Sequence, residues 1–194
     1  KKDRRNPEYH MLLANAYGMK AQGGGISAMF YGGKYKKACE EALRHDPHYV
    51  DAHVGLLYYY VYAPSIAGGG EDRAAETVET IAGLDPFRGA HARGFVAEAS
   101  EDDDAAEEAY VEATSIDSTR VEGWWRLGSF YLERERAAQA ARALERALAL
   151  EPDEPRLIYE LARAHLLAGK DLAAAERGFR EFIAAGRDFG RLTR

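Results

Sequence analysis

The sequence predicts an all-α protein built from about five stacked helix pairs. An acidic residue followed by a helix-stopping residue recurs at Asp46-Pro47, Asp85-Pro86, Asp117-Ser118 and Glu151-Pro152, and the second residues lie 39, 32 and 34 positions apart. Between these marks, apolar residues return every three or four positions, as they do on one face of a helix. A period near 34 residues with this patterning is typical of helix-turn-helix repeats, which must stack on their neighbours to bury their apolar faces.

The first repeat is expected over residues 7–47 and is longer than the later ones. A helical stripe ends at Tyr17, and Gly23-Gly24-Gly25 with a nine-residue surplus precede Cys39 of the second stripe. Cys39 falls on this core stripe, where a small buried hydrophobe is expected. As the only cysteine, it cannot form a disulfide within the chain.

The second repeat, expected over residues 50–86, departs from the pattern in the same place. Ala74 follows Tyr60 by 14 residues where nine are expected, and the surplus holds Pro64 and Gly68-Gly69-Gly70. We therefore expect enlarged connections between the helices of both early repeats, at the same end of the array. Such insertions often form a binding face. The alternative is that the glycine-rich turns only accommodate longer helices.

The third repeat is expected over residues 89–118, with a short acidic connection from Glu101 to Asp104. We interpret this run as a solvated turn in which Asp103 or Asp104 caps the following helix. A calcium loop is disfavoured because it would need alternating ligands and a distal bidentate glutamate.

The fourth repeat, expected over residues 121–152, has the most regular pattern. Its stripe positions are Trp124, Leu127, Gly128 and Tyr131, then Ala140, Leu144, Ala147 and Pro152. The small residues Gly128 and Ala140 should let the two helices approach closely where they cross. Trp124 and Tyr131 should be buried between these helices, and Trp125 should be markedly more exposed.

The fifth repeat is expected over residues 155–186. The five repeats would then form a single array over residues 1–194. Because the chain begins at Lys1 inside a charged run, we expect it to be a fragment or a processed form.

The fourth repeat resembles the tetratricopeptide repeat (TPR) family along its whole length, and the other repeats match in phase. The resemblance implies a right-handed superhelical array. The Pro64…Gly68-Gly69-Gly70 insertion resembles those in bacterial envelope TPR proteins. That likeness favours a bacterial, periplasmic or exported protein, with the cytoplasm as the alternative.

The resemblance also implies a concave groove lined by the first helix of each repeat. Transferring the groove positions one by one, we expect ligand contacts from Tyr58, Tyr62, Arg93, Trp125, Arg126, Ser129, Tyr159 and Arg163. Tyrosine, tryptophan and arginine are enriched at binding hot spots. The alternative is that Trp125 packs between helices and the arginines pair with local glutamates such as Glu122 and Glu160. The TPR type that clamps a C-terminal carboxylate is disfavoured, because only Asn15 matches its ligand positions.

Other kinds of function lack support. The glycine clusters lack the Gly-Lys-Ser/Thr ending of a phosphate-binding loop. Pro47 breaks the helix between His45 and His48, so we expect no metal site near His53 either. No paired carboxylates or Gly-x-Ser-x-Gly elbow indicate catalysis. The net charge of −6 does not favour nucleic-acid binding, and the longest uncharged stretch, 54–70, is broken by Pro64 and three glycines, so we expect no membrane span.

We therefore expect a non-enzymatic protein–protein interaction scaffold without cofactors, which binds a peptide segment or partner protein in its concave groove. One alternative is a carrier of a small apolar ligand, with a pocket under the glycine-rich inserts. Another is self-assembly into a homo-oligomer through the open C-terminal face.

Overall fold

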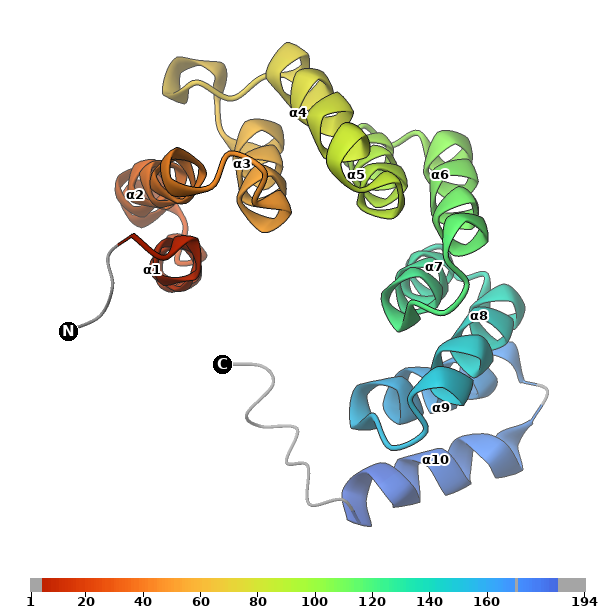
Figure 1. Cartoon of the computed structure of the whole chain (residues 1–194). Coiled ribbons are helices and arrows are strands. Elements are labelled where there is room, and N and C mark those ends of the chain that lie inside the picture. The colour runs from red at the N-terminus through yellow and green to blue at the C-terminus, as the bar shows by residue number, and fades with distance from the viewer. Residues whose placement is uncertain (1–4, 170, 185–194) are drawn as a thin grey trace. The chain divides into compact units, whose positions relative to one another are not determined.

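The computed structural model of the protein describes residues 5–169 and 171–184. All regular secondary structure within these residues is helical (Figure 1). The helices are α1 (Pro7–Ala21), α2 (Gly25–His45), α3 (Val50–Tyr62), the 3-10 helix η1 (Ser65–Ala67), α4 (Glu71–Leu84), α5 (Pro86–Ala99), α6 (Asp103–Ile116), α7 (Val121–Glu133), α8 (Ala137–Leu150), α9 (Pro155–Ala168) and α10 (Leu172–Ala184). The prediction of an all-α array of helix pairs is confirmed, and its handedness remains a prediction.

The chain divides into two compact units, an N-terminal unit of residues 1–106 and a C-terminal unit of residues 107–194. In the N-terminal unit α1 to α5 each pack on the next helix, and α3 also touches α1 and α5. In the C-terminal unit α7 to α10 pack in the same order, and α7 also touches α9. Contacts between alternate helices are what stacked helix pairs require. The single array over 1–194 remains a prediction, and residues 185–186 of the fifth repeat lie outside the described residues.

Capping side chains and prolines start several helices. Asn6 Oδ1 accepts a hydrogen bond from the Glu8 amide at 2.9 Å, and Pro7 opens α1. Asp85 Oδ1 accepts from the Arg88 amide at 3.2 Å, and Pro86 opens α5. Proline suits the first helical position because its missing N–H would have no partner within the helix. The Asp85-Pro86 pair, expected to end the second repeat, therefore starts a helix. Helix α5 begins at Pro86, three residues before the expected start of the third repeat.

The expected cap of α6 is wrong by one or two residues. Asp102 Oδ1 accepts a hydrogen bond from the Ala105 amide at 3.1 Å, so Asp102 is the capping residue. Asp103 and Asp104 lie inside the first turn. The reason is that Glu101 adopts a left-handed conformation (φ 59°), which completes the turn early and places Asp102 at the helix start.

Small residues mark the points where neighbouring helices cross, as expected from Gly128 and Ala140. A Cβ atom on Gly128 would lie 2.6 Å from Leu144 Cγ and 3.5 Å from the Ala140 carbonyl oxygen. Gly55 of α3 makes the equivalent approach to Cys39 of α2, where the Cβ would lie 2.8 Å from Sγ. Only glycine permits these backbone separations.

The expected difference between the two tryptophans is wrong. Tyr131 is buried as expected, but Trp124 and Trp125 are both half-buried. The indole N–H of Trp124 donates to the Ser118 carbonyl at 2.9 Å, so this side chain covers the preceding turn. The aromatic residue fully buried in α7 is Phe130 instead.

The surplus residues of the two early repeats behave differently. In the first repeat, Gln22–Gly24 alone connect α1 to α2, because Gly24 and Gly25 reverse the chain with positive φ (72° and 53°). The surplus instead lengthens α2 to 21 residues, so the expected enlarged connection is wrong there and the longer-helix alternative holds. In the second repeat the enlarged connection is confirmed, and residues 63–70 contain η1.

Candidate functional site

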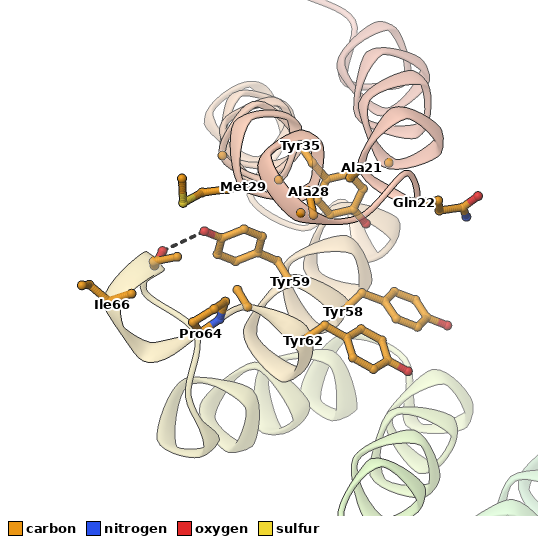
Figure 2. A pocket seen from close by; sticks show the side chains of 16 residues that line it. Ala21, Gln22, Ala28, Met29, Tyr35, Tyr58, Tyr59, Tyr62, Pro64 and Ile66 are labelled. Carbon is orange, nitrogen blue, oxygen red and sulfur yellow. Dashed lines mark hydrogen bonds between the residues drawn. The ribbon is translucent and has the colours of Figure 1, made fainter.

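An apolar cavity of about 640 Å³ lies in the N-terminal unit, between the first turns of α2 and the C-terminal half of α3 with its following connection. Figure 2 shows Ala28, Met29 and Tyr35 on one side and Tyr59, Pro64 and Ile66 on the other. The lining residues are Gly18, Ala21, Gln22, Gly25, Ala28, Met29, Gly32, Gly33, Tyr35, Tyr58, Tyr59, Tyr62, Ala63, Pro64, Ile66 and Ala67. Its size and lining are typical of small-molecule sites.

Both surpluses that disturb the repeat spacing contribute walls to this cavity. The added turns of α2 supply Gly25, Ala28, Met29 and Gly32, and the enlarged connection supplies Ala63, Pro64, Ile66 and Ala67. The Tyr59 hydroxyl donates to the Ala67 carbonyl at 2.7 Å and ties the connection to α3 (Figure 2). The Gly70 amide donates to the Tyr60 carbonyl at 2.9 Å and closes its other end.

Two of the expected ligand contacts, Tyr58 and Tyr62, line this cavity. They are 44% and 70% exposed. Both rings make edge-to-face contacts with Phe95 of α5, at centroid distances of 4.4 and 5.8 Å. This packing fixes the rings at the cavity edge while leaving much of each ring exposed. Arg93, the third expected contact in this unit, is half-buried on α5 and is not a lining residue.

Tyr35 lines the cavity, and Cys39 lies beside it where α2 packs on α3. Burial raises the pKa of the Cys39 thiol to about 12 and also raises the pKa of Tyr35. Both groups are therefore neutral near pH 7, and a neutral thiol is a poor nucleophile. The expectation of a small buried hydrophobe at Cys39 is confirmed, since its exposed fraction is 0%.

A smaller pocket of about 150 Å³ lies in the C-terminal unit. Its lining residues are Trp125, Arg126, Ser129, Leu132, Glu133, Arg156, Glu160 and Arg163. Four of these are expected ligand contacts, on α7 and α9. Helices α7 and α9 are the first helices of consecutive repeats and are in contact, so the repeat stacking brings the four side chains together.

Glu160 organises this pocket. Its Oε2 accepts hydrogen bonds from the Trp125 indole N–H and the Ser129 hydroxyl, both at 3.0 Å. Its Oε1 accepts from Arg156 Nε at 3.2 Å. The carboxylate is therefore held by three donors from two helices. Trp125 thus packs between neighbouring helices, as in the alternative interpretation, and yet also lines the pocket.

The remaining expected contacts of this unit differ in their surroundings. Arg126 Nε donates to the Tyr110 hydroxyl at 3.1 Å, and its guanidinium lies 5.1 Å from the centre of that ring. Arg163 is exposed and, among the described residues, makes no ion pair. Tyr159 is half-buried against Phe179 and Phe182 of α10 and is not a lining residue.

Sequence reasoning missed Arg156 as a pocket residue and named Glu160 only as an alternative partner for an arginine. The signal for the Arg156–Glu160 pair was their spacing of four residues, which places them on one helix face. The sequence signal for the cavity was the surplus of residues in the first repeat. That surplus alone does not predict that the residues extend α2 and form one wall of a cavity.

Residues 5–169 and 171–184 contain no cluster of three or more histidine, cysteine or carboxylate side chains arranged to hold a metal ion. None of the helices within the same ranges has the length and hydropathy needed to cross a membrane.

Stacked helix pairs with crossings at small residues define an all-α helical-repeat protein. Residues 121–164 match the model of the tetratricopeptide repeat family. No curated protein matches the sequence. The predicted resemblance to the TPR family is thereby confirmed, most directly for the fourth repeat.

Several solved structures share the fold. PilW, described as a widely conserved type IV pilus biogenesis factor, is 21% identical with a TM-score of 0.61, covering 92% of this chain and 76% of that one. PilF of Pseudomonas aeruginosa is 20% identical with a TM-score of 0.59, covering 94% and 80%. YrrB, described as a TPR protein with an unusual peptide-binding site, is 14% identical with a TM-score of 0.52, covering 94% and 88%. At these identities the likeness shows the fold.

Proposed function

We propose that this protein is a non-enzymatic interaction scaffold that binds a segment of a partner protein, and that the pocket between α7 and α9 holds an acidic group of that segment. The observation that carries the proposal is the convergence of Trp125, Arg126, Ser129 and Arg163 on one pocket. These residues were selected from the sequence as groove positions. Tyr58, Tyr62, Arg93 and Tyr159 supply further contacts within their own units.

The charge of the pocket favours an acidic ligand. Three arginines and two glutamates line it, and Glu160 already accepts hydrogen bonds from Trp125, Ser129 and Arg156. The second glutamate, Glu133, pairs with Arg134 at 3.2 Å. Arg126 and Arg163 are therefore the side chains best placed to meet a carboxylate, which an arginine fork can hold through two bonds.

The comparisons support a protein as the partner. TPR-type relatives are interaction modules, and one solved relative is described as having a peptide-binding site. A pocket of about 150 Å³ has room for one side chain or terminal group. Affinity would come from adjoining aromatic surface, because hot spots pair a central anchor with surrounding contacts that exclude water.

The test is a random peptide library displayed on phage and selected against the whole chain, followed by dissociation constants for the enriched peptides. We expect these peptides to carry an acidic residue or free C-terminus. Arg163→Ala should weaken them about tenfold, and Arg126→Ala with Arg163→Ala about a hundredfold, since each charge-assisted contact contributes roughly 1.5–3 kcal/mol.

The matched control is Arg142→Ala with Arg146→Ala. Both arginines are exposed on α8 and neither lines the pocket, so the control removes the same charge. Peptides that bind the pocket should bind this control like the wild type. Equal binding by the Arg126/Arg163 variant would reject the pocket as the working surface. The single Arg163→Ala variant keeps the test valid if loss of the Arg126–Tyr110 contact lowers stability.

A second candidate function is favoured by the cavity of the N-terminal unit. Its volume of about 640 Å³ and its apolar lining fit the carrier of a small apolar ligand. This cavity and the pocket between α7 and α9 have no lining residue in common, so one function does not exclude the other.

A further inference from the structure

The two segments that line the cavity of the N-terminal unit carry a net positive charge, although the whole chain carries a net charge of −6. Residues 9–39 contain four lysines and no aspartate or glutamate, and residues 52–70 contain no charged side chain except the titratable His53. All lining residues fall within these two segments. An apolar site lined by such segments attracts a ligand that carries a negative charge at one end.

Two cations converge at one end of the cavity. Lys36 lies one helical turn beyond Gly32 of the α2 wall, and its Nζ is 5.5 Å from the centre of the Tyr59 ring. Arg73 Nη1 donates to the Gly68 carbonyl at 2.9 Å. A Cβ atom built on Gly68 would lie 3.1 Å from Arg73 Nη1 and 3.6 Å from Lys36 Nζ. Both nitrogens therefore border Gly68, the residue that follows the lining residue Ala67.

The acidic neighbour of Lys36 neutralises it only weakly. Glu40 Oε1 is 3.7 Å from Lys36 Nζ, near the limit of an ion pair, and the Glu40 side chain is 46% exposed. Exposed pairs of this kind contribute little. The Lys36 side chain, by contrast, is only 23% exposed. A half-buried ammonium with a loose partner gains more from a ligand carboxylate than a fully solvated one does.

We propose that this cavity binds a single-chain anionic amphiphile, with its alkyl chain against Met29, Tyr59 and Ile66 and its carboxylate beside Lys36 and Arg73. The proposal rests on the second candidate function and names its ligand class. A peptide fits less well, because its backbone N–H and C=O groups need partners that an apolar lining does not supply. The exposed lining residues Met29 and Ile66 are covered once a chain lies across them.

The test is calorimetric titration of the whole chain with decanoate and with decanol, which share the alkyl chain and differ in charge. Both should bind, decanoate more tightly. Lys36→Met should weaken decanoate about tenfold, the size expected for one charge-assisted contact, and leave decanol unchanged. Lys37→Met, at an exposed neighbouring lysine, removes the same charge and should change neither affinity.

A second variant tests the place of binding. A Cβ on Gly32 would lie 3.8 Å from Tyr59 Cε2, so Gly32→Leu fits the helix and extends into the cavity. It should abolish binding of both probes, whereas Gly83→Leu, at an open site on α4, should not. Circular dichroism should show equal helix content for both variants.

The outcomes distinguish the carrier function from the anionic class of its ligand. If neither decanoate nor decanol binds the wild type, the carrier function and the anionic ligand both fail. If decanoate and decanol bind equally tightly and Lys36→Met changes neither affinity, the carrier function is retained and the anionic ligand class is overturned. If Gly32→Leu binds like the wild type, the ligand lies elsewhere and the proposal for this cavity is rejected.

Discussion

The guanidinium group of Arg156 lies over the indole ring of Trp125, 3.8 Å from the ring centre, while both side chains donate hydrogen bonds to Glu160. A cation over an aromatic face and a shared carboxylate stabilise each other, because the carboxylate neutralises the cation and orients the indole. The Glu160 side chain is only 15% exposed, so most of its surroundings are protein rather than water. The contact between α7 and α9 is thus polar as well as apolar.

Glu160→Gln should destabilise the C-terminal unit by about 1–3 kcal/mol, because the neutral amide turns a donor toward Trp125 or Arg156 and leaves a buried group unmatched. The measurement is denaturant unfolding, monitored through tryptophan fluorescence. Glu151→Gln, at an exposed position in the turn after α8, is the matched control and should change stability little. Equal stability of the two variants would contradict a structural role for Glu160.

The repeat pattern could be predicted from the sequence because its determinants are local. Apolar spacing and residues such as Asp85-Pro86 act within one helix and its cap, so they are readable without tertiary structure. The crossing at Gly128 was predictable for the same reason, since a small residue on the core stripe has few other uses. The surroundings of Trp124 and Trp125 could not be predicted in this way. Tertiary packing, rather than local sequence, decides which of these two adjacent rings covers the preceding turn.

Gly128→Ala should destabilise the protein by about 1–3 kcal/mol, because the added methyl group would lie 2.6 Å from the fully buried Leu144. Gly33→Ala is the matched control, since its Cβ meets nothing within 4 Å and it lies in the middle of α2. There the same change should stabilise by about 0.5–1 kcal/mol through helix propensity. Thermal unfolding should therefore move in opposite directions for the two variants.

The two candidate sites were only partly predictable. Tyr58 and Tyr62 were selected, but the opposite wall of their cavity depends on whether surplus residues extend α2 or enlarge a loop. Local sequence permits both, and packing decides. In the other site, Trp125 was selected, but its link to Glu160 depends on how consecutive repeats stack. The sequence therefore indicates which face of a helix lines a site, while the tertiary packing determines which side chains meet there.

Glu107 of α6 is bound by two partners within the C-terminal unit. Its Oε1 accepts from Arg136 Nη2 at 2.7 Å and from the Tyr131 hydroxyl at 2.8 Å. The hydrogen bond from Arg136 is the main cause that lowers the pKa of Glu107 below its usual range. A carboxyl whose pKa falls on folding stabilises the fold above its unfolded-state pKa, and this contribution is lost as the pH falls through the folded-state pKa.

Glu107→Gln should therefore destabilise the protein at pH 7 by about 1 kcal/mol, a modest value because the side chain is 27% exposed. The difference from wild type should shrink as the pH falls below about 4.5, where the unfolded carboxyl becomes protonated, and nearly vanish at lower pH. Urea unfolding at pH 7 and at several acidic values measures this. The control, Glu108→Gln, removes the same charge at an exposed neighbouring position and should have little effect at pH 7. If the difference in unfolding free energy between Glu107→Gln and the wild type stays constant with pH, the shape of the Glu107 side chain rather than its charge stabilises the fold.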